Sequence, residues 1–406
     1  MFTNNFPGVS KRCPIYCFIL SLIFLFIDTG ISYGKNIKGI TDDIVKIGLM
    51  GDLTGPIADG WIPIADGARS YFEMVNREGG VNGRKIKYFL EDDRYSIPLA
   101  LSCYKKLIHK DKIFALQAAS GVGHTAALIP LVEKEKIPLL GATGEKKFFI
   151  PARKYLFSVI PWYMDQAQIV FEYIFKERKY KNPTIVLMHP DTASGKDSRD
   201  AVRELVKLYP VKTYKEVVFS LTAVDYTSEL LLIKRYKPDV IYIHGLVVDT
   251  ASIVNAAYRL GVKTQIIVNQ YGCADEVLKI TGSKAKGLIG VNCFGVWDDN
   301  SSGVKRLRKA ALAYNPNIHR RSPYFFQGWI AAIVFYQGLK NAGRNLTREA
   351  FLRSLESMRN FNTKGICGII GFSPKDHKTI DNSRFYIADP QQQKFVPISD
   401  WKIVKD

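Results

Sequence analysis

The sequence predicts an α/β protein built of two doubly wound, Rossmann-like lobes, and three observations support this fold class. Apolar strand patterns and amphipathic helix patterns alternate along nearly the whole chain, which is typical of parallel sheets covered by helices. The alternation restarts near residues 157–161, so the chain contains two runs of the same architecture. At 406 residues the chain is also too long for one comfortable core. Two similar lobes are therefore expected.

The first βαβ unit carries the strongest pattern. Residues 45–50 form a strand that is apolar on both faces, as parallel strands covered by helices are, and the segment from Asp52 to Pro56 ends it with turn residues. Apolar residues at helical spacing predict a helix over residues 64–78, and Gly79 follows as a left-handed stop. Residues 85–91 form the second strand.

The remaining elements follow from the same two periodicities. The rest of the first run consists of a helix at 99–109, a strand at 114–118, a helix at 125–135 and a strand at 138–140. The second run has strands at 184–188, 215–219, 240–244 and 265–269 and helices at 166–178, 198–209, 226–236 and 251–260. We then expect the chain to return to the first lobe, with a strand at 288–294 and helices at 322–342 and 347–358. The last stretch, residues 371–401, is expected to form hairpin strands, with strands at 384–388 and 394–398.

The composition is that of a globular protein, with 47% hydrophobic and 23% charged residues, and the formal net charge is +19. A field of this sign favours anionic ligands or an anionic membrane surface. Nucleic-acid binding is not expected, because the positive residues are spread through the chain and no helix-turn-helix, zinc-finger or RNA-binding motif is present.

The N-terminus has the pattern of a secretory signal. Lys11 and Arg12 precede an apolar run at residues 15–27, which is shorter than the roughly 20 residues that span a bilayer. Small residues at positions 32 and 34, which a signal peptidase reads, predict cleavage after Gly34. Residues 1–34 would then be a signal peptide and the mature protein periplasmic, with an uncleaved anchor as the alternative.

Four cysteines remain in the mature chain, which is an even number in an oxidising compartment. They are Cys103, Cys273, Cys293 and Cys367. A disulfide between Cys273 and Cys293 is one alternative, and four free buried thiols are the other.

Ligands of open α/β sheets bind beside the carboxyl ends of strands, next to helix N-termini. Residues 119–124 form a Gly-rich turn from a strand to a helix, in which backbone N–H groups can approach an anion such as a carboxylate. Residues 141–144 form a second turn of this kind. The alternative reading is that Ser120 and Thr143 only cap helices. As a nucleotide motif the first turn is weak, since it follows the third strand and lacks the acidic partner for a ribose.

The run LTGPIA followed by VNREGGVNGRKI resembles the start of the periplasmic leucine/isoleucine/valine-binding protein family, the substrate-binding components of ABC importers. The resemblance extends from about residue 44 to the C-terminus. It implies two lobes joined by three hinge crossings near residues 160, 293 and 371, which close around a ligand. Lobe I would hold residues 35–159 and 294–371, and lobe II residues 160–293 and 372–406.

The resemblance also implies a set of ligand-binding residues. In the family the two Gly-rich turns hold the carboxylate of the ligand through a serine, a backbone N–H and a threonine, and Ser120 with Gly121, Gly141 and Thr143 occupy those places here. Trp61 lies near the place of an aromatic that covers the ligand, with packing under the loop as the alternative. Another aromatic near the site corresponds to Phe325 or its neighbour Phe326, for which a core role is the alternative.

In the second lobe the sequence departs from that family. Amino-acid binders of the family carry an acidic residue that holds the ligand's ammonium, and the matching position here is Gln270. Leu246 stands where the family has an aromatic residue, and Ser194 stands where it has a tyrosine after the first strand of this lobe. A neutral amide does not balance a buried ammonium. Asp249 or Asp275 could compensate, although neither matches by position. A carboxylate without an amine, or an amide accepted by Gln270, is therefore an open alternative to an amino acid.

Catalysis is not expected, since the HExxH, GxSxG and P-loop motifs are absent, and no cofactor or metal is predicted. The sequence predicts an exported, monomeric solute-binding protein that delivers a small, carboxylate-bearing ligand to the permease of an ABC importer. The alternatives are a periplasmic sensor of the same fold that signals through a membrane receptor, and an amide or urea binder.

Overall fold

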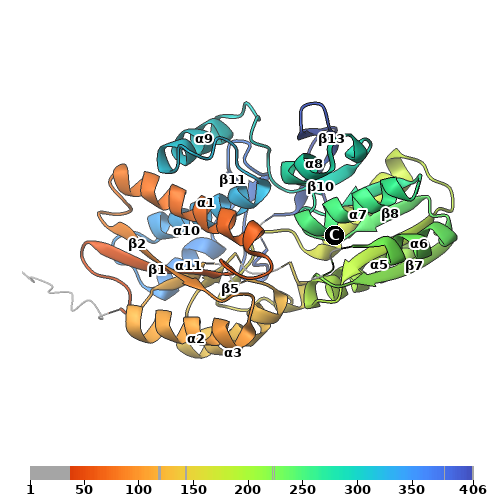
Figure 1. Ribbon diagram of the computed structural model, residues 1–406. Helices are drawn as coiled ribbons and strands as arrows, with labels where there is room; N and C mark the ends of the chain where they lie inside the picture. Colours follow the sequence, from red (N-terminus) through yellow and green to blue (C-terminus); the bar gives the residue numbers. More distant parts are fainter. Residues whose placement is uncertain are drawn as a thin grey trace, which may run out of the picture. The chain divides into compact units, whose positions relative to one another are not determined.

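The computed structural model describes residues 37–117, 120–141, 144–221, 223, 225–378 and 380–404 (Figure 1). Two sheets organise these residues. One has five strands in the order β2-β1-β3-β4-β5, and the other has the order β14-β13-β10-β9-β8-β6-β7 with β15 attached to β13. Below, the first lobe is the five-stranded sheet with its helices, and the second lobe is the larger sheet with its helices. The predicted α/β class with two sheets is confirmed.

Every strand pair in the sheet of the first lobe is parallel. β1 and β2 pair along eight residues, because both carry apolar side chains at positions that face the helices. The strand order reverses between β1 and β3, which opens a crevice at their carboxyl ends. The strands are β1 (Ile44–Gly51), β2 (Lys85–Asp92), β3 (Ala115–Gln117), β4 (Leu139–Leu140) and β5 (Leu156–Phe157).

Helices cover both faces of this sheet, with α2 and α3 on one face and α1 and α10 on the other (Figure 1). A fully buried cluster that includes Phe72, Trp329 and Phe335 joins α1 and α10 to the sheet. The helices of the first lobe are α1 (Ala58–Arg77), α2 (Ile97–Lys106), α3 (Val122–Glu135), α9 (Ser302–Tyr314), α10 (Pro323–Ala342) and α11 (Arg348–Glu356). α2 continues as a π-helical turn at Leu107–Asp111, and a 3₁₀ turn lies at Lys146–Phe148.

α1 and α10 pack backbone to backbone through two glycines. A Cβ added at Gly67 would collide with the carbonyl oxygen of Phe325, and one added at Gly328 would collide with that of Ile64. The missing side chains therefore set the distance between the two helices. This close approach places the start of α10, which carries Tyr324, beside the first turns of α1.

The second lobe has a parallel centre and an antiparallel edge. β10 pairs with β9 in parallel and with β13 antiparallel. The C-terminal strands thus complete a sheet that the middle of the chain begins. Its strands are β6 (Thr184–Pro190), β7 (Thr213–Phe219), β8 (Val240–Ile243), β9 (Gln265–Val268), β10 (Ile289–Asn292), β13 (Asn382–Asp389), β14 (Lys394–Pro397) and β15 (Lys402–Ile403). Its helices are α4 (Tyr163–Glu172) with a π-helical turn at Tyr173–Glu177, α5 (Ala193–Leu208), α6 (Thr227–Tyr236), α7 (Val247–Arg259), α8 (Asp275–Thr281) and a 3₁₀ turn at Gly282–Ala285.

The chain passes three times between the two sheets. It leaves the first sheet after β5, leaves the second sheet after β10 to form α9, α10 and α11, and returns after the small β11–β12 pair (Phe361–Asn362 and Ile369–Ile370). The predicted crossings near residues 160, 293 and 371 lie in these three connections. The lobe boundaries drawn from them stay predictions, and the predicted signal peptide lies outside the described residues.

Sequence reasoning placed most of these elements and missed a few. α1 begins six residues before the predicted position and has Pro63 inside it. The predictions omitted α8, which has seven residues, and α9, although Val304, Leu307 and Ala311 are buried at helical spacing. Among the described residues, we find no helix with the length and apolarity that a bilayer span requires.

Candidate ligand-binding site

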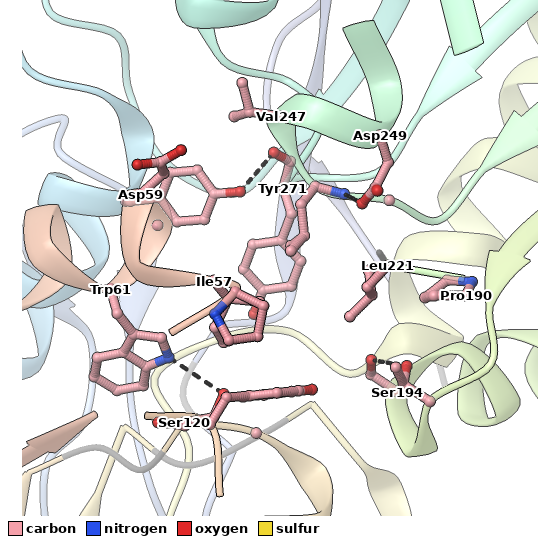
Figure 2. Close-up of a pocket in the computed structure, with 18 of the residues that line it drawn as sticks. Ile57, Asp59, Trp61, Ser120, Pro190, Ser194, Leu221, Val247, Asp249 and Tyr271 are labelled. Carbon is pink, nitrogen blue, oxygen red and sulfur yellow. Dashed lines mark hydrogen bonds between the residues drawn. The ribbon is translucent and has the colours of Figure 1, made fainter. Parts of the chain in front are cut away.

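A cavity of about 200 Å³ lies where the carboxyl ends of both sheets meet (Figure 2). This volume is below the roughly 300–1,000 Å³ of pockets for drug-sized ligands, so it suits a small solute. Residues of the first lobe on its wall include Ile57, Trp61, Tyr95, Ser120, Gly121, Val122, Gly141 and Tyr324. Residues that follow β5 and the strands of the second lobe include Tyr163, Pro190, Ser194, Leu221, His244, Leu246, Asp249 and Tyr271.

Two aromatic contacts shape the cavity. The indole Nε1–H of Trp61 donates to the backbone carbonyl of Ser120 at 3.2 Å, which ties the first turn of α1 to the loop after β3 (Figure 2). Gly51 at the end of β1 leaves room for this indole, since a Cβ there would collide with it. Trp61 therefore does both things that the sequence left open: it packs under the loop and lines the cavity.

The second aromatic contact joins the lobes. The rings of Tyr271, after β9, and Tyr324, at the start of α10, are stacked with centroids 5.8 Å apart. The Tyr324 hydroxyl donates to the backbone carbonyl of Tyr271 at 2.8 Å. This hydrogen bond connects one lobe to the other across the cavity wall.

The side chain of Ser120 does not direct its proton into the cavity. Its Oγ lies 2.5 Å from Oδ1 and 2.6 Å from Oδ2 of Asp93, whose carboxylate is fully buried and also accepts the backbone N–H of Tyr95. A hydroxyl has a single proton, so Ser120 presents lone pairs to a ligand while it holds Asp93. Burial raises the pKa of the Asp93 carboxyl, against the hydrogen bond from Ser120.

In the loop after β4, the backbone N–H that was expected to bind the ligand donates to another residue of the protein instead. Gly141 lines the cavity, but its N–H donates to the carbonyl of Phe157 at 3.2 Å. Its φ of +76° lies in the left-handed region, which favours glycine at this position. Thr143, the third residue of the predicted carboxylate clamp, lies outside the described residues.

The N-terminus of α3 supplies the donors that these side chains do not. Gly121 is its N-cap and no side chain caps the helix, so the N–H groups of its first turn have no intrahelical partner. Gly121 and Val122 both line the cavity. A helix N-terminus also carries partial positive charge. This end of the cavity is therefore suited to an anion.

A buried histidine lies behind this helix end. His124 contacts Tyr95, with ring centroids 4.8 Å apart, and neither ring nitrogen has a hydrogen-bond partner among the described residues. Burial lowers the pKa of His124, while the charge of Asp93 opposes that change. The structure thus keeps His124 in the interior.

On the opposite wall, the loop after β8 presents His244. Its Nδ1 lies 3.2 Å from Nδ2 of Asn269, and the ring of Tyr163 meets it edge-on at 4.9 Å between centroids. Burial lowers the pKa of His244 to about 3, so the ring is neutral at physiological pH.

Asp249 anchors the same loop. Its Oδ1 accepts the hydroxyl of Tyr226 at 2.8 Å and its Oδ2 accepts the N–H of Leu246 at 3.1 Å. Burial raises the pKa of the Asp249 carboxyl. Leu246, the N-cap residue of α7, lines the cavity as expected from the sequence. The other acidic residue on the wall is Asp59, which is exposed at the first turn of α1.

Two residues expected at the ligand lie elsewhere. Gln270 is not part of the cavity wall; its Oε1 accepts the thiol of Cys293 at 3.2 Å. Phe325 is fully buried in the core of the first lobe, stacked on Trp329 with centroids 6.3 Å apart, because α10 turns that face toward the sheet. Asp275 pairs with Arg320 and lies outside the cavity wall.

The four described cysteines are free thiols, so the structure contains no Cys273–Cys293 bridge. Sequence reasoning did not assign the four tyrosines on the cavity wall or His244 to the site. One signal was available for His244 and Tyr271, since His244 directly follows a buried strand and Tyr271 lies in the loop that follows the next one. The tyrosines are Tyr95, Tyr163, Tyr271 and Tyr324.

Comparisons with known proteins agree with this architecture. A family model described as periplasmic binding protein matches residues 44–393. The leucine-, isoleucine-, valine-, threonine-, and alanine-binding protein of Pseudomonas aeruginosa is 24% identical over 350 residues, which are 84% of this chain and 88% of that protein.

Two solved structures show the same fold. A branched chain amino acid ABC transporter from Thermus thermophilus with bound valine superposes with a TM-score of 0.83 at 19% identity, covering 90% of this chain and 98% of that chain. A fatty acid ABC transporter substrate-binding protein from Thermomonospora curvata superposes with a TM-score of 0.79 at 20% identity, covering 91% and 94%. With its two α/β lobes and a cavity at their strand ends, the chain belongs to the periplasmic binding protein family of non-catalytic proteins.

Proposed function

We propose that the protein captures a small carboxylate-bearing solute between its two lobes in the periplasm and delivers it to the permease of an ABC importer. The observation that carries this proposal is the uncapped N-terminus of α3 on the cavity wall. No lysine or arginine is among the described residues that line the cavity. A carboxylate would therefore be held by neutral N–H donors and the helix dipole.

The ligands of proteins with the same fold are compatible with this class. The Thermus thermophilus structure holds valine, and the Thermomonospora curvata protein is named for fatty acids. Both kinds of ligand carry a carboxylate, and only valine carries an ammonium. The shared chemical group is the one for which this cavity offers free donors.

The apolar wall supports a ligand with a hydrocarbon portion. Ile57, Leu221 and Leu246 line the cavity together with the aromatic side chains. Burying a methylene group contributes about 0.8 kcal/mol. Affinity would come from this burial and from lobe closure, and orientation from the helix end.

A substitution that removes one backbone donor tests the proposal. Val122 is the first residue of α3, where proline is tolerated, and Gly121 before it is extended, as a residue preceding proline should be. Val122→Pro deletes the N–H and keeps the helix. We expect affinity for a carboxylate ligand to fall by roughly 1.5–3 kcal/mol, the value of a hydrogen bond to a charged group.

Ser302→Pro is the matched control, since Ser302 is the exposed first residue of α9, away from the cavity wall, and also follows an extended N-cap. Isothermal titration with carboxylates found by thermal-shift screening of residues 35–406 measures both variants. Equal affinities for Val122→Pro and the unchanged protein, with equal melting temperatures, would refute the role of the α3 N-terminus.

A further inference from the structure

The protonation of His244 follows from its neighbours. Oδ1 of Asn269 accepts the N–H of Gly272 at 3.1 Å and lies 3.5 Å from the N–H of Gly245, which orients the amide of Asn269. Its Nδ2 therefore donates to Nδ1 of His244 at 3.2 Å. With Nδ1 acting as an acceptor, the proton of the neutral imidazole is on Nε2.

No hydrogen bond to Nε2 of His244 is among the contacts of the described residues, and Nε2 is not one of the buried polar atoms that lack a partner. The side chain is only 4% exposed, yet it lines the cavity. A donor on a cavity wall is normally paired with water or with a ligand. The cavity is the place from which a partner for this N–H can come.

The acidic residue of the second lobe on the cavity wall is Asp249. Each of its carboxyl oxygens already accepts one hydrogen bond within the lobe, and burial raises the pKa of this carboxyl, while Gln270 is neutral and lies off the cavity wall. Asp59 lies on the first lobe and is exposed to solvent. An ammonium beside His244 would face an N–H donor and would have to share Asp249 with the two donors that this carboxyl already accepts.

Resting on the carboxylate-binding function proposed above, we propose that the ligand carries a second, uncharged oxygen acceptor that binds the Nε2–H of His244, as the keto oxygen of a 2-oxo acid would. The carboxylate occupies the N-terminus of α3, the acceptor oxygen faces His244, and the hydrocarbon portion contacts Ile57, Leu221 and Leu246. His244 then determines specificity against amino acids, because it offers a donor where an ammonium requires an acceptor.

Ligands that differ only in the head group test this inference on the unchanged protein. The probes are 4-methyl-2-oxopentanoate, 4-methylpentanoate, leucine and 4-methyl-2-oxopentanamide, together with the same four head groups on a straight-chain and a phenyl skeleton. In every skeleton that binds, we expect the 2-oxo acid to bind at least about tenfold more tightly than the acid without the oxygen, the effect of one buried hydrogen bond.

The outcomes separate the two proposals. Equal binding of the oxo acid and the plain acid, or tighter binding of leucine, overturns the role of His244 and leaves the carboxylate function standing. Binding of the amide as tightly as the oxo acid, or binding of no carboxylate in any skeleton, overturns the carboxylate function as well.

His244→Phe removes the donor and keeps a ring of similar shape, and His319→Phe changes an exposed histidine as the control. The His244 variant should lose about tenfold more affinity for the oxo acid than for the plain acid. If it does not fold, the ligand series on the unchanged protein remains decisive. Leucine binding that is abolished by Asp59→Asn would identify Asp59 as an ammonium acceptor and overturn the inference.

Discussion

The strongest stability prediction concerns a buried ion cluster between the first and third passages of the chain between its sheets. Nζ of Lys378 lies 2.8 Å from Oδ2 of Asp165 and 2.7 Å from Oδ1 of Asp381. It also lies 4.1 Å from the ring centroid of Trp162. The side chains of Lys378 and Asp165 are each 6% exposed, so the pair is shielded from water and salt.

Lys378→Met keeps most of the side-chain volume and removes the charge. Asp165 would then remain buried, with the backbone N–H of Trp162 as its remaining donor among the contacts that the structure gives. Removing one partner of a buried pair costs about 3–5 kcal/mol. The second substitution Asp165→Asn removes the stranded charge, so the double variant should recover more than half of the loss.

Urea unfolding of the two single variants and the double variant measures this coupling as a double-mutant cycle. Lys207→Met is the control, because the Lys207–Glu204 pair is exposed and such pairs contribute at most about 1 kcal/mol. A loss of stability below about 1 kcal/mol for Lys378→Met would refute the reasoning, and so would a double variant that is no more stable than Lys378→Met alone.

Two further stability predictions follow from the core and the buried histidines. Gly328→Ala should destabilise the protein by about 1–3 kcal/mol in urea unfolding, because its Cβ meets the carbonyl of Ile64. Gly123→Ala is the control, because its Cβ would meet only the flexible end of the Ile97 side chain, and it should lose less stability. An unchanged Gly328 variant would contradict the close helix contact. The pKa of His244 is lowered from 6.5 to about 3 in the folded protein, so below pH 6.5 the unfolded chain binds a proton that the folded chain does not. The stability of the protein should therefore fall by about 2 kcal/mol between pH 7 and pH 5 from this residue alone. His244→Phe should flatten that dependence, and an unaltered pH profile would refute it.

The sequence alone determined the order of elements and the class of the fold. Apolar strands, amphipathic helices and glycine stops depend on neighbours within a few residues, so β1 and the helix after it could be placed from periodicity. The restart of the pattern near residue 160 likewise predicted a second lobe. Gly121 was expected at the ligand because its turn follows a strand end, where such sheets bind ligands, whereas Trp61 and Leu246 were expected there from the family resemblance; all three line the cavity.

Only the tertiary structure decided which polar groups remain available to a ligand. Ser120 directs its proton to Asp93, and Gly141 donates to Phe157, partners that lie 27 and 16 positions away in the chain. The free donor on His244 depends on the amide of Asn269, which in turn is oriented by a backbone N–H. Each hydrogen-bonding group has few protons and lone pairs, and how they are shared is settled by long-range packing, which a pattern of residues along the chain does not record.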